Sequence, residues 1–146
     1  MRVFIDGDSA PIIDIAIDVS RKYDIEVIIV KDVNHDLKNF NYDKLNIITI
    51  DQGRDNADLY IINNIKKGDI VVTSDLGLAS LVLGKTDKCI NFNGLIINNN
   101  NLDGLMMNRY INANLRRQNI YSKGPSKRKK EDDKNFKVNL ERIIKD

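Results

Sequence analysis

The sequence is short of several residue types, and each shortage excludes a class of protein. Its 146 residues contain one cysteine and one histidine. A single cysteine, Cys89, cannot form an internal disulfide, so nothing calls for an oxidising compartment. With so few sulfur and imidazole ligands, a zinc site is not expected either.

Long apolar runs are also missing. No run reaches the roughly 18 residues that a membrane-spanning helix needs. Asp6 and Asp8 interrupt the first apolar stretch, which argues against a signal peptide. We therefore expect a cytoplasmic protein with no membrane segment, and the length fits a single domain at residues 1–146.

Charge is unevenly distributed along the chain, although the formal net charge is only +2. Residues 1–108 hold 11 Lys and Arg against 16 Asp and Glu, a net charge of −5, whereas residues 109–146 hold 12 against 5, a net charge of +7. An acidic part beside a basic part suits a cation and a phosphate-bearing polymer such as RNA. A solvated basic tail would give the same count, so charge alone does not decide.

Short apolar segments alternate with amphipathic ones along the chain. This alternation predicts an α/β fold with a mostly parallel central sheet that helices cover on both faces. A polar loop with a Gly-Pro break is expected at about 122–133. Strands are predicted at residues 2–6, 26–31, 46–50, 69–73, 88–92 and 95–97, and helices at 11–23, 55–67, 75–83, 102–119 and 135–144.

Short polar residues mark the expected ends of these elements. Asp8 or Ser9 is predicted to cap the first helix. One of the asparagines at 98–101 is predicted to cap the fourth helix. Gly68 is expected to stop the second helix. The Asn93–Gly94 pair predicts a tight turn between the last two strands.

Aspartates gather where three predicted strands end. The first strand delivers Asp6 and Asp8, the third is followed by Asp51 and then by Asp55 and Asp58, and the fourth by Asp75. Functional sites of open α/β sheets form where strands end and helices begin. We therefore expect these carboxylates to share a crevice if their strands are neighbours.

Each aspartate also has a purely structural explanation. Asp8 and Asp75 can be simple helix caps, and negative charge at Asp55 and Asp58 suits the first turns of a helix. Asp6 is harder to explain this way, because charge at the end of a buried strand is costly unless it is paired or coordinated.

The joint occurrence of acids at three strand ends favours a metal site. Clustered carboxylates repel one another, and Mg²⁺ or Mn²⁺ with oxygen ligands relieves that repulsion. Two such ions about 3.5–4 Å apart can activate water and stabilise a leaving oxygen in phosphodiester cleavage.

Weaker candidates for substrate contacts lie outside the acidic group. The hydroxyls of Thr73 and Ser74 can hold a water or a phosphate oxygen, although such groups often serve the turn instead. Arg109 and Arg116 share one face of the fourth helix and can bind phosphates or pair with surface acids. The basic run at 127–130 is of a kind that is usually solvated.

The ordered motifs IDGDSAP, GRDNAD, VVTSDLGLA and RYINANLRR resemble the YaiI/YqxD family of small bacterial proteins, which is placed among the PIN-like, NYN-type nucleases. The similarity covers nearly the whole chain. It implies a three-layer α/β/α PIN-like domain, with a basic loop and a C-terminal helix at about 122–146. It also implies metal-binding or catalytic acids at Asp6, Asp8, Asp55, Asp58 and Asp75.

The first motif departs from the family pattern at one informative position. Ala10 stands where the family has a cysteine, which argues against thiol chemistry here. The resemblance does not establish an activity, because the family is itself uncharacterised and a fold does not fix a function.

Three functions remain open from the sequence. The first is a Mg²⁺- or Mn²⁺-dependent ribonuclease or related phosphodiesterase. The second is a protein that binds RNA or a nucleotide without cleaving it. The third is a haloacid-dehalogenase-type phosphatase with Asp6 as the nucleophile, which the early Pro11 and the lack of a convincing lysine argue against.

Overall fold

The computed structural model describes the chain except for residues 8, 33–39, 52, 54–55 and 120–126. The described residues form strands and helices in the alternation that the sequence predicts. In chain order the elements are β1 (Arg2–Asp6), α1 (Ala10–Tyr23), β2 (Glu26–Asp32), β3 (Leu45–Ile50), α2 (Asn56–Asn64), β4 (Ile70–Val72), α3 (Leu76–Val82), β5 (Lys88–Ile90), β6 (Ile96–Ile97), α4 (Leu102–Arg117) and α5 (Lys130–Lys145).

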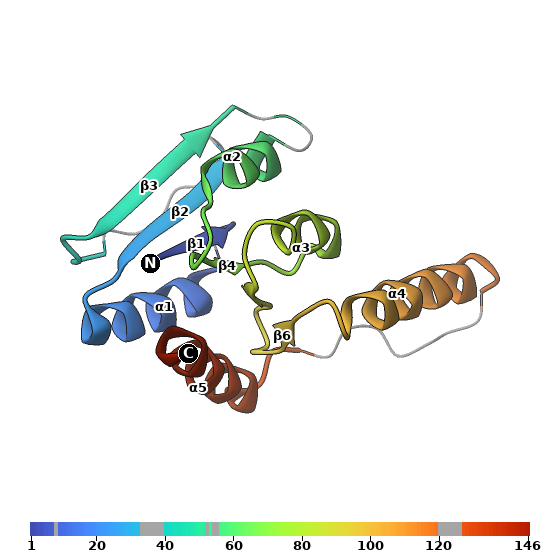
Figure 1. Cartoon of the computed structure of the whole chain (residues 1–146). Coiled ribbons are helices and arrows are strands. Elements are labelled where there is room, and N and C mark those ends of the chain that lie inside the picture. The colour runs from blue at the N-terminus through green and yellow to red at the C-terminus, as the bar shows by residue number, and fades with distance from the viewer. Residues whose placement is uncertain (8, 33–39, 52, 54–55, 120–126) are drawn as a thin grey trace.

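The strands form one sheet in the order β3-β2-β1-β4-β5-β6. Every neighbouring pair is parallel except the last, in which β6 returns antiparallel to β5. Helices α1 and α5 cover one face of the sheet, and α2 and α3 cover the other (Figure 1). The expectation of a three-layer α/β/α fold with a mostly parallel sheet is confirmed.

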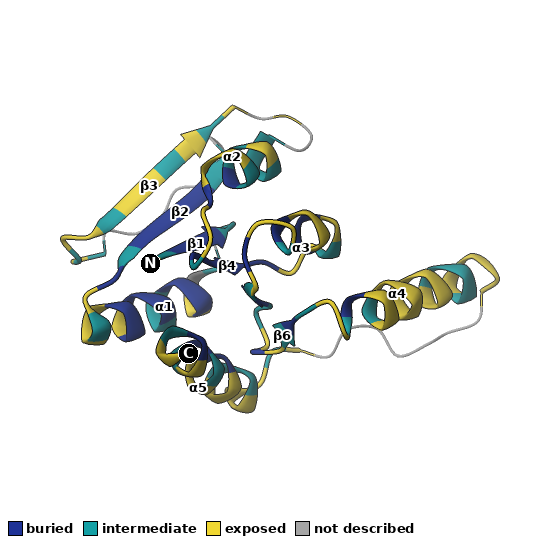
Figure 2. Ribbon diagram, in the orientation of Figure 1, coloured by how far each residue is buried: buried dark blue, intermediate teal, exposed yellow. Residues whose placement is uncertain are grey.

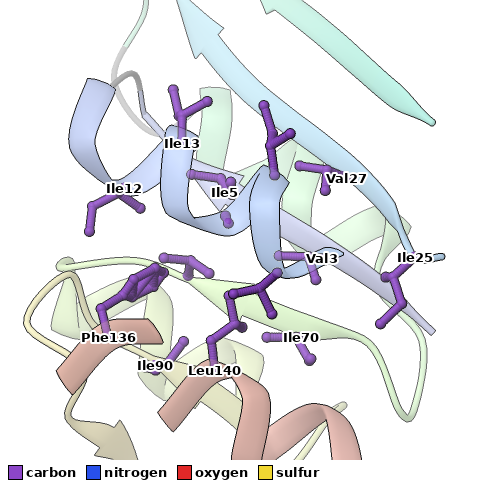
Figure 3. Packing of buried hydrophobic residues seen from close by; sticks show 14 of the residues in the cluster. Val3, Ile5, Ile12, Ile13, Ile25, Val27, Ile70, Ile90, Phe136 and Leu140 are labelled. Atoms are coloured by element: carbon purple, nitrogen blue, oxygen red, sulfur yellow. The ribbon is translucent and has the colours of Figure 1, made fainter. Parts of the chain in front are cut away.

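Alternation along the central strands divides the core between the two faces. Val3 and Ile5 of β1 pack toward α1 and α5, whereas Phe4 between them packs toward α2 and α3. The central strands are buried on both faces, as the burial colours of Figure 2 show, which is why their sequences read as continuous apolar runs. Figure 3 shows Phe136 and Leu140 of α5 packed under α1 and the sheet.

Strand order reverses between β1 and β4. From β1 the chain moves outward to β2 and β3, and it then crosses back through α2 to β4 on the other side of β1. In open α/β sheets, ligands bind outside the carboxyl ends of the strands at such a reversal. Asp6 at the end of β1 and Asp75 shortly after β4 flank this point.

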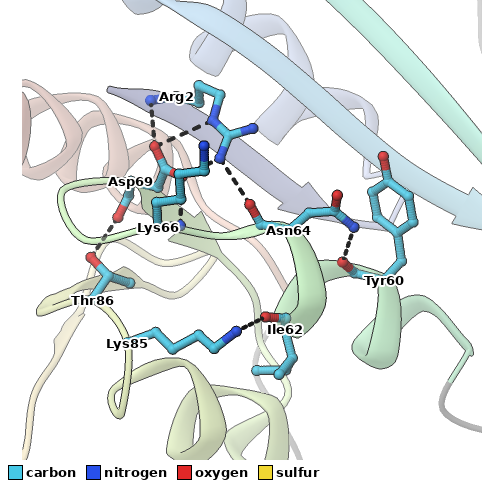
Figure 4. A network of polar contacts seen from close by, with 8 residues as sticks. All are labelled: Arg2, Tyr60, Ile62, Asn64, Lys66, Asp69, Lys85 and Thr86. Carbon is cyan, nitrogen blue, oxygen red and sulfur yellow. Dashed lines mark hydrogen bonds and ion pairs between the residues drawn. The ribbon is translucent and has the colours of Figure 1, made fainter.

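A polar network fastens the opposite edge of the sheet, where β1 and β4 begin (Figure 4). Buried Asp69 accepts hydrogen bonds from the backbone N–H of Arg2, at 3.0 Å, and from its Nη2, at 2.7 Å. The Thr86 hydroxyl donates to the Asp69 carbonyl at 2.7 Å. This network holds β1 and β4 together at their amino ends, away from the carboxyl ends where the strand order reverses.

Helix α2 ends at Asn64, three residues before the predicted end at Lys67, and the same network binds its last carbonyl groups. The Asn64 carbonyl accepts from Arg2 Nη2 and the Ile62 carbonyl from Lys85 Nζ, at 2.8 and 2.6 Å. The Lys66 N–H donates to Asp69 Oδ2 instead of to the helix. Cationic side chains from distant parts of the chain therefore satisfy the last carbonyls of α2, and Gly68 lies beyond the helix end.

Two predicted caps occupy the expected positions but act differently. Ser9 is the N-cap residue of α1 and Asn101 that of α4, yet neither side chain makes a capping hydrogen bond. The Asn101 side chain instead accepts from the Asn98 N–H and donates to the Ile96 carbonyl. Asn101 therefore fixes the turn that leads from β6 into α4.

The C-terminal helix begins earlier than predicted, at Lys130, so the expectation of a loop to residue 133 is wrong. Arg128, in the run expected to be solvated, donates to the Phe92 carbonyl at 2.7 Å and to Asp133 Oδ1 at 2.6 Å. These bonds tie the start of α5 to the chain after β5 and bring α5 against the sheet.

No helix within the described residues is long and apolar enough to cross a membrane.

Cys89 is a buried free thiol in β5, as expected for a core residue.

Candidate functional site

A cavity of about 290 Å³ opens at the carboxyl ends of β1, β2 and β3, under the start of α2. Its lining is strongly acidic, with five aspartates and one lysine among the described residues. The lining residues are Asp6, Gly7, Val30, Lys31, Asp32, Ile50, Asp51, Gly53, Asn56, Ala57, Asp58 and Asp75.

Gly7 makes the turn that places Asp6 in this cavity. Its φ of +106° is one that residues with a Cβ rarely adopt, and its N–H donates to the Val30 carbonyl at 3.0 Å. The chain can therefore leave β1 sharply while Asp6 stays at the strand end. The expected position of Asp6 at the end of the first strand agrees with this geometry.

Thr73 connects the two sides of the strand reversal. Its fully buried hydroxyl donates to Asp6 Oδ2 at 2.8 Å and accepts the Asp75 N–H at 3.0 Å. Thr73 thus positions Asp6 on β1 relative to Asp75 at the start of α3. Among the predicted substrate contacts, Thr73 lies beneath the cavity, where its hydroxyl is already used by the two aspartates.

Burial raises the pKa of Asp6 above its ordinary value of 3.8. The Thr73 hydrogen bond lowers this pKa, and the negative charge of Asp75 raises it further. The charged form of Asp6 is therefore costly in the folded protein, and a cation beside it would relieve that cost.

Asp75 combines a structural role with a place in the cavity. Its Oδ1 accepts from the N–H groups of Gly77 and Leu78, at 2.8 and 3.3 Å, and so caps α3. The structural explanation that the sequence offered for Asp75, a helix cap, therefore holds. Because Asp75 also lines the cavity, capping does not remove it from the candidate site.

Asp58, in the first turn of α2, lines the same cavity and completes a set of three with Asp6 and Asp75. Asp8 and Asp55, the other two predicted acids, lie outside the described residues. Among the residues that are described, no group of three or more acidic, histidine or cysteine side chains is drawn together closely enough to hold a metal ion.

Sequence reasoning missed two charged residues of the cavity, Lys31 and Asp32. Both end β2, which pairs directly with β1 in a register that matches Asp6 to Val30. The prediction named acids after the first, third and fourth strands only. The available signal was the charged pair Lys31 and Asp32 directly after the apolar run of β2, since the carboxyl ends of adjacent parallel strands meet at one edge.

Ser74 and Arg109 line a second, shallower groove of about 330 Å³ between the start of α3 and α4. Asn91, Asn108 and Asn112 contribute to the same groove. Arg116 is exposed near the end of α4 and is not part of this lining. The structure therefore groups Ser74 with Arg109 and leaves Arg116 apart.

The donor set of the cavity suits a hard cation. Its ionisable ligands are carboxylates, with amide and carbonyl oxygens nearby and no histidine or cysteine among the described lining residues. Mg²⁺ and Mn²⁺ prefer such oxygen ligands. Asp6, Asp58 and Asp75 line this cavity together, but within the described residues they are not drawn close enough to form a metal site by themselves.

Comparison with known proteins adds a family but no activity. Residues 4–146 match the model of a family described as "Uncharacterized BCR, YaiI/YqxD family". No solved structure matches the chain.

Similar proteins from several bacteria carry the name "UPF0178 protein". The one from Natranaerobius thermophilus is 46% identical over 144 residues, which cover 99% of this chain and 96% of the relative. Those from Clostridium kluyveri and Exiguobacterium sibiricum are 44% and 39% identical over 99% of this chain and 93% and 96% of the relatives. With nearly full coverage on both sides, the chain belongs to the YaiI/YqxD family.

Proposed function

We propose that the protein is a ribonuclease or related phosphodiesterase that depends on Mg²⁺ or Mn²⁺. The observation that carries this proposal is the acidic cavity at the strand reversal, in which burial and the charge of Asp75 both raise the pKa of Asp6. A carboxylate that is disfavoured in its charged form, beside other carboxylates, is suited to a cation.

The aspartates have distinct roles in this proposal. Asp6, Asp58 and Asp75 hold the metal, and Asp8 and Asp55 bind it or position the attacking water. When bound, the metal supplies activation of a water and stabilisation of the leaving oxygen. Thr73 keeps Asp6 and Asp75 in a fixed relation through its two hydrogen bonds.

The groove beside α4 supports RNA as the substrate. Ser74, next to Asp75 in the chain, faces this groove together with Arg109. A strand of RNA with its scissile phosphate at the cavity can continue along the groove, where arginine and asparagine side chains bind the backbone. Contacts of this kind are largely independent of base sequence.

The proposed activity agrees with the resemblance to PIN-like, NYN-type nucleases. That superfamily assignment is part of the proposal, as is a cytoplasmic location. A protein that binds RNA in the same cavity without cleaving it remains the alternative that the experiment below separates.

End-labelled single-stranded RNA tests the proposal directly. Cleavage is measured with Mn²⁺, Mg²⁺ or EDTA for the wild type, Asp6→Asn and a matched control, Asp87→Asn. Asp87 is exposed before β5, at the opposite edge of the sheet. We expect metal-dependent cleavage that is lost in Asp6→Asn and kept in Asp87→Asn.

Two results would redirect the proposal. Cleavage that persists in Asp6→Asn would place the activity elsewhere or in a contaminant. No cleavage by the wild type, with Mn²⁺ binding still detected by calorimetry and lost in Asp6→Asn, would retain the metal site and favour binding without turnover.

Lys31 favours a second candidate, the haloacid-dehalogenase-type phosphatase. This lysine lines the cavity with Asp6 and Asp32, whereas the sequence showed no convincing lysine for such a site. Hydrolysis of p-nitrophenyl phosphate, with inhibition by BeF₃⁻ that requires Asp6, would support this candidate over the nuclease.

A further inference from the structure

Helix α4 carries an apolar surface that its packing does not explain. It extends away from the sheet in Figure 1, and its main packing partner among the described elements is α3. Four large side chains of α4 are exposed, to 42% at Met106, 57% at Met107, 63% at Tyr110 and 46% at Ile111. Contiguous exposed apolar residues of this size mark interaction surfaces.

These four residues lie on one face of the helix. Met106 and Met107 are adjacent, and Tyr110 and Ile111 follow them four positions later. Because an α-helix advances about 100° per residue, the two pairs lie one above the other on neighbouring turns. Leu105, Arg109 and Asn112 lie on the opposite face, where they line the groove against α3. The apolar face therefore points away from the body of the protein and away from the proposed substrate groove.

Opposite charges stand at the two ends of this apolar face. Asp103 lies in the first turn of α4 and Arg117 in the last, and both are exposed. Viewed down the helix axis, both residues point within about 20° of the direction of Tyr110. Each is seven residues from Tyr110, which corresponds to about 10 Å along the axis on either side.

We propose that α4 pairs antiparallel with α4 of a second copy of this chain, with the twofold axis at Tyr110. The symmetry places Asp103 of each copy opposite Arg117 of the other, so two acid–base pairs flank an apolar centre of methionine, tyrosine and isoleucine. A parallel arrangement would instead bring Arg117 against Arg117, where like charges repel. Antiparallel helix dipoles favour the same arrangement.

The surface also has the composition of an interface. Methionine and tyrosine are enriched in interface cores, and charged groups belong at the rim. One helix of 16 residues, about 24 Å long, provides a small contact area, so association is expected to be reversible and concentration-dependent. Because Arg109 faces the other way, the pairing leaves the substrate groove accessible and does not depend on the proposed function.

Sedimentation equilibrium of the full chain over a range of concentrations tests the pairing. We expect a monomer–dimer equilibrium in the wild type. Asp103→Arg and Arg117→Asp should each raise the dissociation constant roughly tenfold or more, because two attractions become two repulsions. The double variant Asp103→Arg/Arg117→Asp should restore dimerisation, because the charges are exchanged and not removed.

Two further variants complete the test. Tyr110→Ser should raise the dissociation constant by at least about tenfold with an unchanged circular dichroism spectrum, because a central aromatic residue dominates a small interface. Asp18→Arg, exposed on α1 on the other face of the sheet, should leave the dissociation constant unchanged. A wild type that stays monomeric at all concentrations would overturn the proposal, and so would a dimer that Asp103→Arg leaves intact or that the double variant fails to restore.

Discussion

The carboxylate of Asp6 is subject to opposing influences. Burial and the charge of Asp75 raise its pKa, and the Thr73 hydrogen bond lowers it, with a net increase over the ordinary value. A carboxyl whose folded-state pKa exceeds its unfolded value stabilises the fold fully only at pH below the unfolded value. That contribution is lost as the pH rises through the raised pKa, so at neutral pH ionised Asp6 lowers the free energy of unfolding.

Asp6→Asn should therefore unfold at a higher temperature than the wild type at pH 7 in EDTA. The difference should shrink as the pH falls through the raised pKa of Asp6 toward the ordinary value of 3.8, because folded Asp6 takes up its proton above that value. Differential scanning calorimetry measures both effects, with Asp87→Asn as the control. A variant less stable than the wild type at pH 7 would show that the charge of Asp6 is already compensated.

Addition of Mn²⁺ should reverse the order of stability. A ligand that binds only the folded state raises its stability, by about 2.7 kcal/mol at a concentration 100 times the dissociation constant. The wild type should gain thermal stability with Mn²⁺, whereas Asp6→Asn should gain little. Equal gains in both proteins would place the bound ion away from Asp6.

Cys89 should be chemically inert in the folded protein. Burial raises the pKa of its thiol to about 12, so almost no reactive thiolate is present at pH 8. Ellman's reagent should modify Cys89 slowly in buffer and rapidly in denaturant. Fast modification in buffer would mean that β5 opens readily.

At the scale of elements, the turn between β5 and β6 holds α5 in place. Gly94 has a φ of +88°, and a Cβ there would lie 2.5 Å from the backbone of Asn135 and Phe136. Asn139 also donates to the Gly94 carbonyl at 2.7 Å. Close contact between this turn and the α5 backbone therefore requires glycine.

Gly94→Ala should lower the free energy of unfolding by roughly 2–4 kcal/mol, from the strained φ and the overpacking together. Gly104→Ala is the matched control, because an added Cβ there meets nothing within 4 Å and lies in α4. It should raise stability by up to about 1 kcal/mol. Urea denaturation distinguishes the two, and a neutral Gly94→Ala would mean that α5 can shift without cost.

Local pattern was sufficient to predict most elements but not their ends. The buried runs of β1 and β2 and the Asn93–Gly94 turn have signals within a few residues. The end of α2 has no such local signal, because Arg2 and Lys85 supply its last hydrogen bonds from distant parts of the chain. The role of Arg128 was missed for the same reason, since its partner Phe92 lies 36 residues away.

At the scale of the whole molecule, strand order decides which acids meet. Asp6, Asp58 and Asp75 could be predicted from their places after strands. The charged residues Lys31 and Asp32 after the apolar run of β2 are visible in the sequence, but their place in the cavity follows from the pairing of β2 with β1, which no short segment encodes. The buried contact of Thr73 with Asp6 likewise spans the strand reversal and joins residues 67 positions apart.

The proposed path of RNA predicts a salt-dependent contribution from Arg109. Arg109→Ala should weaken binding of single-stranded RNA similarly for different sequences and reduce the slope of log K against log salt by about 0.7. Arg142→Ala, exposed on α5 away from the groove, is the control and should change neither quantity. Fluorescence anisotropy at several salt concentrations measures both, and an unchanged slope in Arg109→Ala would exclude this path.

The position of α5 has a consequence for folding during synthesis on the ribosome. Phe136 and Leu140 fill the face between α1 and the sheet, yet they are synthesised after every other described element. The sheet can pair and the acidic cavity can form while the α1 face is still uncovered. Until α5 emerges, that apolar surface is open to chaperones and to other nascent chains, so the α1 face of the core is completed only when the last of the described elements has been made.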